Sequence, residues 1–149
     1  MQVIMRRYTT ADKTAVLQLI RAELVPLSNT VHSLDGKLLR LLPRRLKQGV
    51  TLIAGRTRSS PPLAFIHYMT GNKLLFIDML VVHSRYQGKQ LGTQLMCAAE
   101  ADGRARGCSR ALLFVDKGND GAVRFYNRLG YTLARYDQAL QCYELGKPL

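Results

Sequence analysis

Acidic residues are scarce in this sequence. Among 149 residues there are 10 Asp and Glu against 22 Lys and Arg, so the formal net charge is +12. No acidic residue occurs between Asp35 and Asp78. This balance excludes an acidic chaperone or a calcium buffer, and it favours an anionic partner such as nucleic acid, a membrane surface or a polyanionic small molecule. Because 47% of the residues are hydrophobic, the basic charge decorates a folded core and not a disordered tail.

The sequence also has few cysteines and no long apolar run. Cys97, Cys108 and Cys142 form an odd set without CxxC spacing, and no Cys and His positions fall at a zinc-ligand spacing. The longest apolar run, residues 111–115, is far shorter than the roughly 20 residues that cross a bilayer. The first residues lack the apolar core of a signal peptide. We therefore expect a cytoplasmic protein with no metal site and no membrane-spanning segment.

Apolar spacing divides the chain into strands and helices without a linker or an internal repeat. We expect a single α/β (α+β) domain over residues 1–149 with a mixed sheet of about seven strands. The predicted strands cover residues 3–8, 50–56, 63–70, 73–82, 111–116, 131–136 and 139–145. The predicted helices run from an N-cap at Thr10 to Pro26, and over residues 33–48, 90–106 and 120–129, with Pro43 as a kink or break in the second helix.

Two connections fix the expected sheet topology. The three strands between residues 50 and 82 follow one another across short breaks, which predicts an antiparallel meander. The helix at 90–106 then connects the strands at 73–82 and 111–116, and such a crossover places two strands side by side in parallel.

Residues 80–96, LVVHSRYQGKQLGTQLM, join a strand to a helix through a basic loop that contains glycine. Such a junction directs unpaired backbone N–H groups and the positive end of the helix dipole at one spot, which can bind phosphate. The alternative is that Gly88 and Gly92 only permit a tight turn.

This segment resembles the GNAT superfamily of acyl-CoA-dependent N-acyltransferases, in which a Leu-x-Val-like triplet precedes a Gln/Arg-x-x-Gly-x-Gly/Ala loop. Gln90 stands where the family has its first glycine; the side chain is tolerated if residue 90 is helical, but weakens binding if it needs a positive φ. The resemblance assigns acetyl-CoA binding to the triplet Leu80, Val81 and Val82 and to the loop residues Gln87, Gly88, Lys89, Gln90, Leu91, Gly92 and Thr93.

Residues 119–131, NDGAVRFYNRLGY, resemble a second segment of the same family, Asn-x-x-Ala-x-x-x-Tyr-x-x-x-Gly-Phe/Tyr. The resemblance implies that Asn119 holds the pantetheine arm and that Tyr126 is the general acid for the departing thiolate. It also implies a sheet that splays between its fourth and fifth strands, where the backbone N–H groups of Leu80 and Val82 polarise the thioester carbonyl. The alternative is that Tyr126 is a core tyrosine of an amphipathic helix.

Asp78 is the candidate general base, because strand alternation puts Phe76, Asp78, Leu80 and Val82 on one face, toward the cofactor. The alternative is that Asp78 pairs with one of the many Arg residues. Family members that act on protein N-termini often carry Glu where this chain has Phe114, which argues against a close copy of those enzymes.

The three histidines carry less weight in the expected mechanism. We expect His67 and His83 to be structural or solvated. His32 lies in the loop on the side where the family receives its acceptor, so it is a candidate substrate contact.

The expected function is acetyl transfer from acetyl-CoA to a small-molecule or peptide amine. The amine attacks the thioester directly in a ternary complex. We expect the protein to be a monomer or homodimer and to need no metal. A neutral or anionic amine-bearing molecule suits the basic stretch at 37–58 better than a polyamine. The alternative, suggested by Gln90 and the basic helix at 37–47, is a catalytically weak GNAT-fold protein that binds CoA or docks on nucleic acid or the ribosome, with nucleic acid the less favoured partner.

Overall fold

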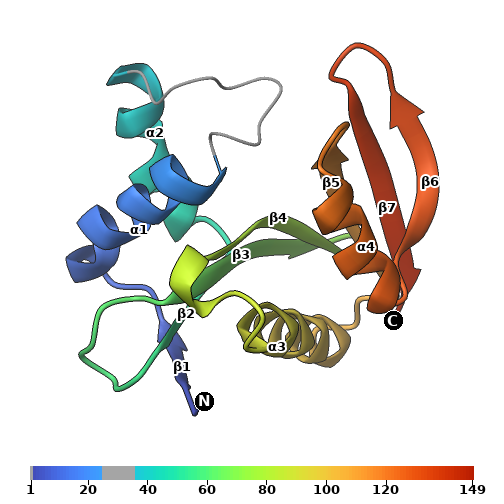
Figure 1. Cartoon of the computed structure of the whole chain (residues 1–149). Coiled ribbons are helices and arrows are strands. Elements are labelled where there is room, and N and C mark those ends of the chain that lie inside the picture. The colour runs from blue at the N-terminus through green and yellow to red at the C-terminus, as the bar shows by residue number, and fades with distance from the viewer. Residues whose placement is uncertain (1, 25–35) are drawn as a thin grey trace.

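One mixed sheet organises the fold in the computed structural model, which describes residues 2–24 and 36–149 (Figure 1). Its strand order is β1-β2-β3-β4-β5-β7-β6, and every neighbouring pair is antiparallel except the parallel pair β4–β5. The expected class, element order, meander and crossover are therefore confirmed. The strands are β1 (Ile4–Arg7), β2 (Val50–Gly55), β3 (Ala64–Gly71), β4 (Leu74–Val82), β5 (Arg110–Asp116), β6 (Thr132–Asp137) and β7 (Cys142–Pro148).

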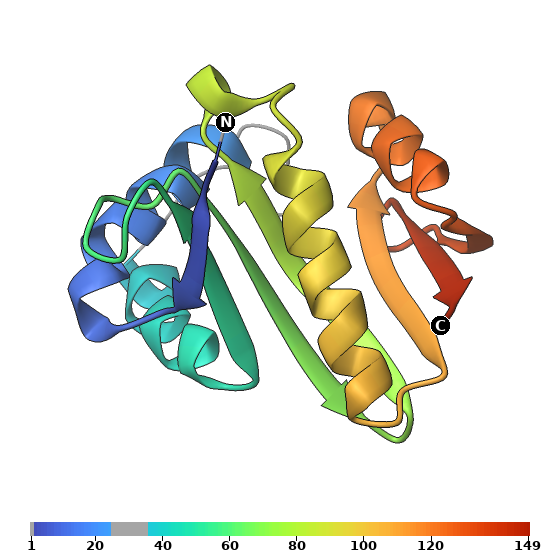
Figure 2. The same cartoon turned by 90° about the horizontal axis from the view of Figure 1, so that it is seen from below.

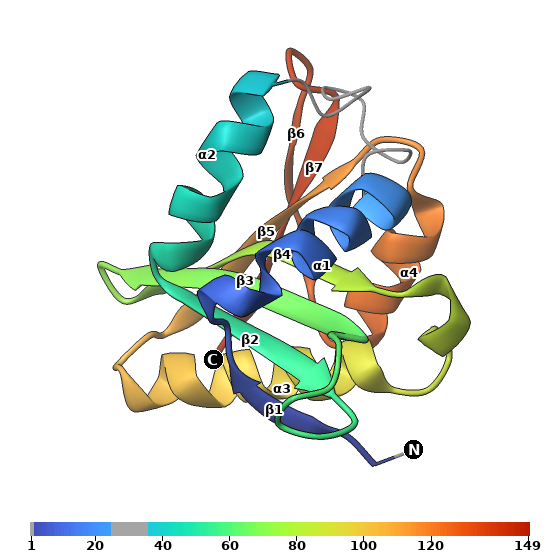
Figure 3. The same ribbon diagram turned by 90° about the vertical axis from the view of Figure 1, so that its left-hand side faces the viewer.

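Helices cover both faces of this sheet. Figure 3 shows α1 and α2 on one face and α3 on the other, and these faces hold two separate apolar cores. None of the helices in the described ranges is long and apolar enough to cross a membrane. The helices are α1 (Lys13–Leu19), α2 (Gly36–Lys47), α3 (Leu91–Ala105) and α4 (Asp120–Arg128).

The first helical segments differ in detail from the sequence expectation. The N-cap is Thr9 and not Thr10, because Asp12 accepts a hydrogen bond from the backbone N–H of Thr9 at 2.9 Å in a capping box. A single π-helical turn, Ile20–Leu24, continues α1. Pro43 lies inside α2, so it does not break that helix. The beginning of the second predicted helix, residues 33–35, and His32 lie outside the described residues.

Strands β4 and β5 pair over only a short stretch. Their register joins Leu74–Phe76 to residues 110–112, and residues 77–82 of β4 have no strand partner on that side. In Figure 2 the two strands separate toward the end of the sheet where α3 begins and α4 lies. The expected splay between the fourth and fifth strands is therefore confirmed.

A β-bulge at Asp78 changes which residues of β4 face which side. His67 pairs with Met79 but Tyr68 pairs with Ile77, so Asp78 has no residue opposite it on β3. Before the bulge, Ile77 packs in the core on the α3 side, whereas Met79, two residues later, packs in the core under α1 and α2.

The predicted common face of Phe76, Asp78, Leu80 and Val82 is therefore wrong. Asp78 is hydrogen-bonded to Arg45 of α2, whereas Leu80 and Val82 pack against the core on the α3 side. A strict two-residue period fails here because the bulge inserts one unpaired residue.

A buried polar cluster fastens α3 to the C-terminal strands. Glu100 of α3 is 5% exposed, and its carboxylate accepts a hydrogen bond from the Tyr131 hydroxyl at 2.7 Å and one from Lys147 at 2.9 Å. Burial and the bond to Glu100 raise the pKa of Tyr131 above its ordinary value, so the phenol stays a donor. The cluster pairs a charge that would otherwise be costly to bury.

We predict that Tyr131→Phe lowers the free energy of unfolding by about 1–2 kcal/mol, because Glu100 loses a buried donor. Urea unfolding followed by circular dichroism measures the change. The control is Tyr136→Phe, which removes the same hydroxyl from an exposed residue of β6. An equal effect of the two substitutions would show that the bond to Glu100 contributes nothing.

Candidate active site

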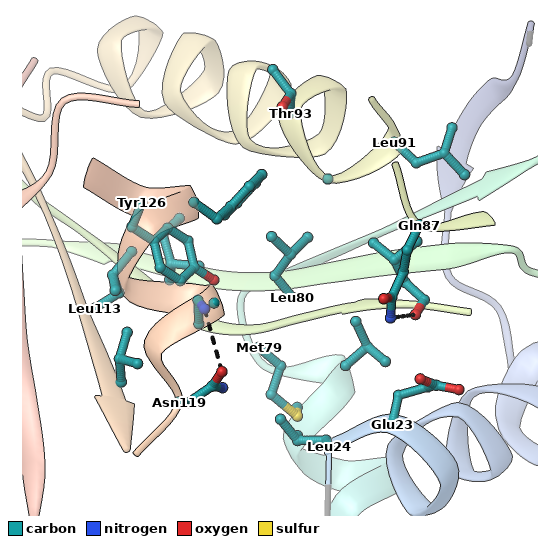
Figure 4. A pocket seen from close by; sticks show the side chains of 18 of the residues that line it. Glu23, Leu24, Met79, Leu80, Gln87, Leu91, Thr93, Leu113, Asn119 and Tyr126 are labelled. Atoms are coloured by element: carbon teal, nitrogen blue, oxygen red, sulfur yellow. Dashed lines mark hydrogen bonds between the residues drawn. The ribbon is translucent and has the colours of Figure 1, made fainter. Parts of the chain in front are cut away.

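A cavity of about 930 Å³ lies where β4 and β5 separate (Figure 4). One wall comes from β4 with the loop that leads into α3, and the opposite wall from β5 and α4; the π-helical turn after α1 closes a third side. The cavity is lined by every predicted catalytic or cofactor-binding residue except Lys89, namely Asp78, Leu80, Val81, Val82, Gln87, Gly88, Gln90, Leu91, Gly92, Thr93, Asn119 and Tyr126.

The loop before α3 is held in a tight conformation. The Gln87 side chain donates to the Val82 carbonyl at 3.2 Å, and both Gly88 and Gln90 have positive φ, 75° and 69°. Gly92 serves packing, because a Cβ there would lie 3.2 Å from the Phe125 ring of α4. The loop thus directs the first N–H groups of α3, a helix of 15 residues, at one end of the cavity.

Gln90 occupies the left-handed region, with φ 69° and ψ 10°. The sequence left open whether residue 90 is helical or has a positive φ, and the structure has the positive φ. Glycine adopts this conformation without strain, whereas glutamine does not. The Gln90 side chain is exposed and lines the cavity, so it does not obstruct the loop.

Cations gather outside the cavity beside this loop. Arg56 of the β2–β3 loop donates to the Tyr86 hydroxyl at 3.3 Å, and its guanidinium lies 5.5 Å from the centre of that ring. The bond and charge of Arg56, together with Arg85 and Lys89, lower the pKa of Tyr86. Lys89 therefore belongs to a basic rim and not to the cavity wall, and this rim suits a polyanionic ligand.

Tyr126 combines a packed ring with an available hydroxyl. Its ring makes edge contacts with Phe125 and Tyr131, at centroid distances of 5.1 and 5.8 Å. The hydroxyl points into the cavity (Figure 4) and has no hydrogen-bond partner among the described residues. Burial raises the pKa of Tyr126 above its ordinary value, so at neutral pH the phenol is protonated and can donate.

Asn119 is the N-cap of α4. Its side-chain oxygen accepts a hydrogen bond from the backbone N–H of Ala122 at 3.3 Å, shown as a dashed line in Figure 4. This bond uses the side-chain oxygen and orients the side chain. The amide NH₂ group of Asn119, which lines the cavity, is not used by this bond.

Asp78 is a buried carboxylate that bonds both Arg45 and His67. Its side chain is 2% exposed and accepts two hydrogen bonds from Arg45, one of them from Nε at 2.9 Å. It also bonds Nδ1 of His67 at 2.7 Å, while Nε2 of that fully buried ring bonds the Gln48 carbonyl at 2.6 Å.

This network is compatible with both interpretations of Asp78, as a base and as the partner of an Arg. Burial alone would raise the pKa of Asp78, but the hydrogen bonds from His67 and Arg45 outweigh it and lower that pKa. The expected pairing with an Arg is therefore present, and the fully buried His67 ring is a second partner of Asp78. Since Asp78 also lines the cavity, its role as a base stays a prediction.

Sequence reasoning did not predict most of the other residues of the cavity wall, among them Glu23, and it considered Phe114 only as the position where some family members carry Glu. The Glu23 carboxylate accepts a hydrogen bond from the backbone N–H of Ser84 at 3.3 Å, which ties the π-helical turn to the end of β4. One feature of the sequence could have identified Glu23: it is the sole acidic residue between Asp12 and Asp35. Within the described ranges, no three His, Cys, Asp or Glu side chains are grouped as a metal site.

Comparison with known proteins gives one family match and many similar folds. Residues 37–131 match the model of the acetyltransferase (GNAT) family. The chain is 44% identical over 46 residues to mycothiol acetyltransferase of Streptosporangium roseum, which is 31% of this chain and 14% of that protein. It is 33% identical over 63 residues to an acetyltransferase of Agrobacterium fabrum, which is 42% of this chain and 44% of that protein. The matches thus span less than half of each curated relative.

Solved structures align over the whole chain. The PaiA N-acetyltransferase of Thermoplasma acidophilum in complex with coenzyme A has a TM-score of 0.80 at 15% identity and full coverage of both chains. Ard1 of Thermoplasma volcanium has a TM-score of 0.80 at 18% identity, with coverage of 100% of this chain and 99% of the other. At these identities the likeness concerns the fold.

We predict that Gln90→Gly raises the free energy of unfolding by about 0.5–1 kcal/mol, because relief of the left-handed strain exceeds the added entropy of the unfolded chain. Thermal and urea unfolding measure it. The control is Gln87→Gly, the same exchange at an extended residue, which should not stabilise the fold. A loss of stability in the Gln90 variant would contradict the strain argument.

Proposed function

Because the chain belongs to the GNAT family of acetyltransferases, we propose that it transfers an acetyl group from acetyl-CoA to an amine by direct attack on the thioester. The observation that carries this proposal is the cavity between the separated strands β4 and β5, which brings both motif segments to one place. The three free cysteines among the described residues accord with a reaction in the cytoplasm.

The residues present fit acetyl-CoA as the acyl donor. We assign the pyrophosphate to the backbone N–H groups of the loop at 87–93, with the basic rim beside it. The pantetheine arm carries two amides, and the side of β4 that faces β5 over residues 77–82 offers backbone groups without a strand partner. The coenzyme A complex of the similarly folded PaiA supports the assignment.

The proposed chemistry forms a C–N bond and breaks the C–S bond of the thioester. The backbone N–H groups of Leu80 and Val82 stabilise the negative charge that develops on the carbonyl oxygen. The amine gives up a proton to Asp78, directly or through a water, and Tyr126 donates its hydroxyl proton to the departing thiolate. The unpartnered hydroxyl of Tyr126 supports this role.

The similarly folded N-acetyltransferases support an amine as the acceptor, on either a peptide or a small molecule. Similar folds include the NatC complex bound to a Gag peptide and CoA, and a ribosomal-protein-S18-alanine N-acetyltransferase of Escherichia coli. A peptide amine is therefore one acceptor class in the proposal, and a small-molecule amine is the other.

Tyr126→Phe should reduce kcat by about 100-fold, since the thiolate loses its proton donor. We expect the Kd for CoA to stay within a factor of about three, because the ring that packs against Phe125 and Tyr131 remains. Thiol release and calorimetric titration measure the two quantities. Unchanged turnover would remove Tyr126 from the mechanism.

The environment of Asp78 indicates how it would act. Three hydrogen bonds hold its carboxylate, and its lowered pKa keeps it ionised at neutral pH but makes it a weak base. Transfer through an ordered water suits such a group better than full protonation of the carboxylate, because the proton passes on to solvent.

Asp78→Asn should lower kcat/KM by about 100-fold for an alkylamine, which is protonated at pH 7 and must lose a proton before attack. The loss should shrink to less than about tenfold for an acceptor that is already neutral at that pH, such as hydroxylamine. Initial rates of thiol release with the two acceptors give the comparison. Equal losses for both would assign Asp78 a purely structural role.

A second candidate function rests on the exposed face of α2. Arg40, Arg44 and Lys47 are exposed at helical spacing, as a surface that docks on nucleic acid would require. Calorimetric titration with CoA beside a salt-dependent RNA shift assay distinguishes the two: RNA binding would favour docking, and micromolar CoA binding without RNA binding favours the enzyme.

A further inference from the structure

His67 of β3 is a fully buried polar side chain beside the proposed base. Its neighbours in the strand, Ile66 and Tyr68, pack in the core on the α3 side, so alternation turns the His67 ring toward α1 and α2. The ring is 0% exposed. Burial of such a ring costs free energy unless its nitrogens are hydrogen-bonded, so the groups that face the two nitrogens determine its protonation state.

Both ring nitrogens of His67 face hydrogen-bond acceptors. Nε2 lies 2.6 Å from the carbonyl oxygen of Gln48, and a carbonyl can only accept, so Nε2 carries a proton. Nδ1 lies 2.7 Å from Oδ2 of Asp78. Arg45 donates two hydrogen bonds to the same carboxylate, which favours its ionised form, so Nδ1 carries a proton as well. A histidine that donates from both nitrogens is an imidazolium.

The bonds to Asp78 fill most of its acceptor positions. A carboxylate offers about four lone-pair positions, two on each oxygen. Oδ2 accepts from Nε of Arg45 and from Nδ1 of His67, whereas Oδ1 accepts from a terminal nitrogen of Arg45. Among the described residues, one position on Oδ1 therefore has no donor. Since Asp78 lines the cavity, this position is where a water or an amine can bond.

We infer that His67 is held as an imidazolium and is a positioning residue of the proposed reaction. It fixes Oδ2 of Asp78, so that Oδ1 bonds the amine or the water that carries its proton. The inference rests on the proposed function and adds one residue to it. The side chain of Arg45 is 49% exposed, so solvent screens its charge, whereas the buried His67 ring keeps its full effect on Asp78.

Nitrogen NMR of the isotopically labelled wild-type protein at pH 7 tests the protonation state without a measurement of activity. The chain has three histidines, so His32→Asn and His83→Asn assign the signals of the third. We expect two ring N–H groups on His67, although a free imidazole is mainly neutral at this pH. A ring with one unprotonated nitrogen, as when a protonated Asp78 donates to Nδ1, would overturn the imidazolium.

His67→Asn tests the positioning role, because it removes the charge but keeps an amide N–H donor. We expect kcat/KM to fall about tenfold for pentylamine, which must lose a proton, and less than about twofold for hydroxylamine, which is already neutral. In the Asp78→Asn background the same substitution should cause no further loss, because both residues act through one group. Initial rates of thiol release with acetyl-CoA measure these effects, and His67→Gln replaces the Asn variant if that variant does not fold.

Tyr68→Phe is the matched structural control. It removes the buried hydroxyl that donates to Asp102 at 2.7 Å, one residue along β3 and on the other side of the sheet. Any activity that this variant loses should be the same for both acceptors and should persist in the Asp78→Asn background. Equal losses for both acceptors in the His67 variant, or a loss that persists without Asp78, would overturn the positioning role.

The outcomes separate this inference from the proposed function. If the wild-type protein releases no thiol with either acceptor, the proposed function fails and the positioning role fails with it, while NMR still decides the protonation state. If thiol is released but the His67 variant shows no dependence on the acceptor, the positioning role alone is wrong. Two ring N–H groups together with an acceptor-dependent loss support both.

Discussion

Strands β4 and β5 are paired at three residues, Leu74–Phe76, and the rest of the molecule is built around their separation beyond that point. On the far side of β4 the sheet continues through β3, and on the far side of β5 through β7, so each strand stays fixed while one edge of each is left open. The start of α3 packs against α4 through Gly92 and Phe125, which closes the gap from one face. The cavity is therefore a consequence of strand pairing and not of a flexible loop.

The bulge at Asp78 gives the two ends of this cavity different surroundings. It turns Leu80 and Val82 toward the α3 side, where the loop and α4 meet, and turns Asp78 toward Arg45 of α2. The bonds from Arg45 and His67 hold Asp78 in place, and removing one partner would leave its buried carboxylate with only the other. One extra residue in one strand thus separates the proposed donor end from the proposed acceptor end.

The order of the elements could be predicted because each has its own apolar period and its own breakers, and both motif segments lie within continuous stretches of sequence. The facing of Asp78 could not, because a bulge is set by pairing with β3 and leaves no mark in the spacing of β4 itself. Glu23 and Phe114 join the cavity only through tertiary packing of distant elements. The sequence does not determine the backbone conformation of Gln90. Its positive φ is known only from the structure.

In the proposed complex, the open edge of β4 holds the pantetheine arm with the sulfur beside Tyr126. A crystal structure of the protein grown with CoA tests this most directly. We expect the arm between β4 and β5, the pyrophosphate on the loop at 87–93, and the sulfur within hydrogen-bonding distance of the Tyr126 hydroxyl. CoA bound elsewhere on the protein, or no bound CoA at millimolar concentration, would contradict it.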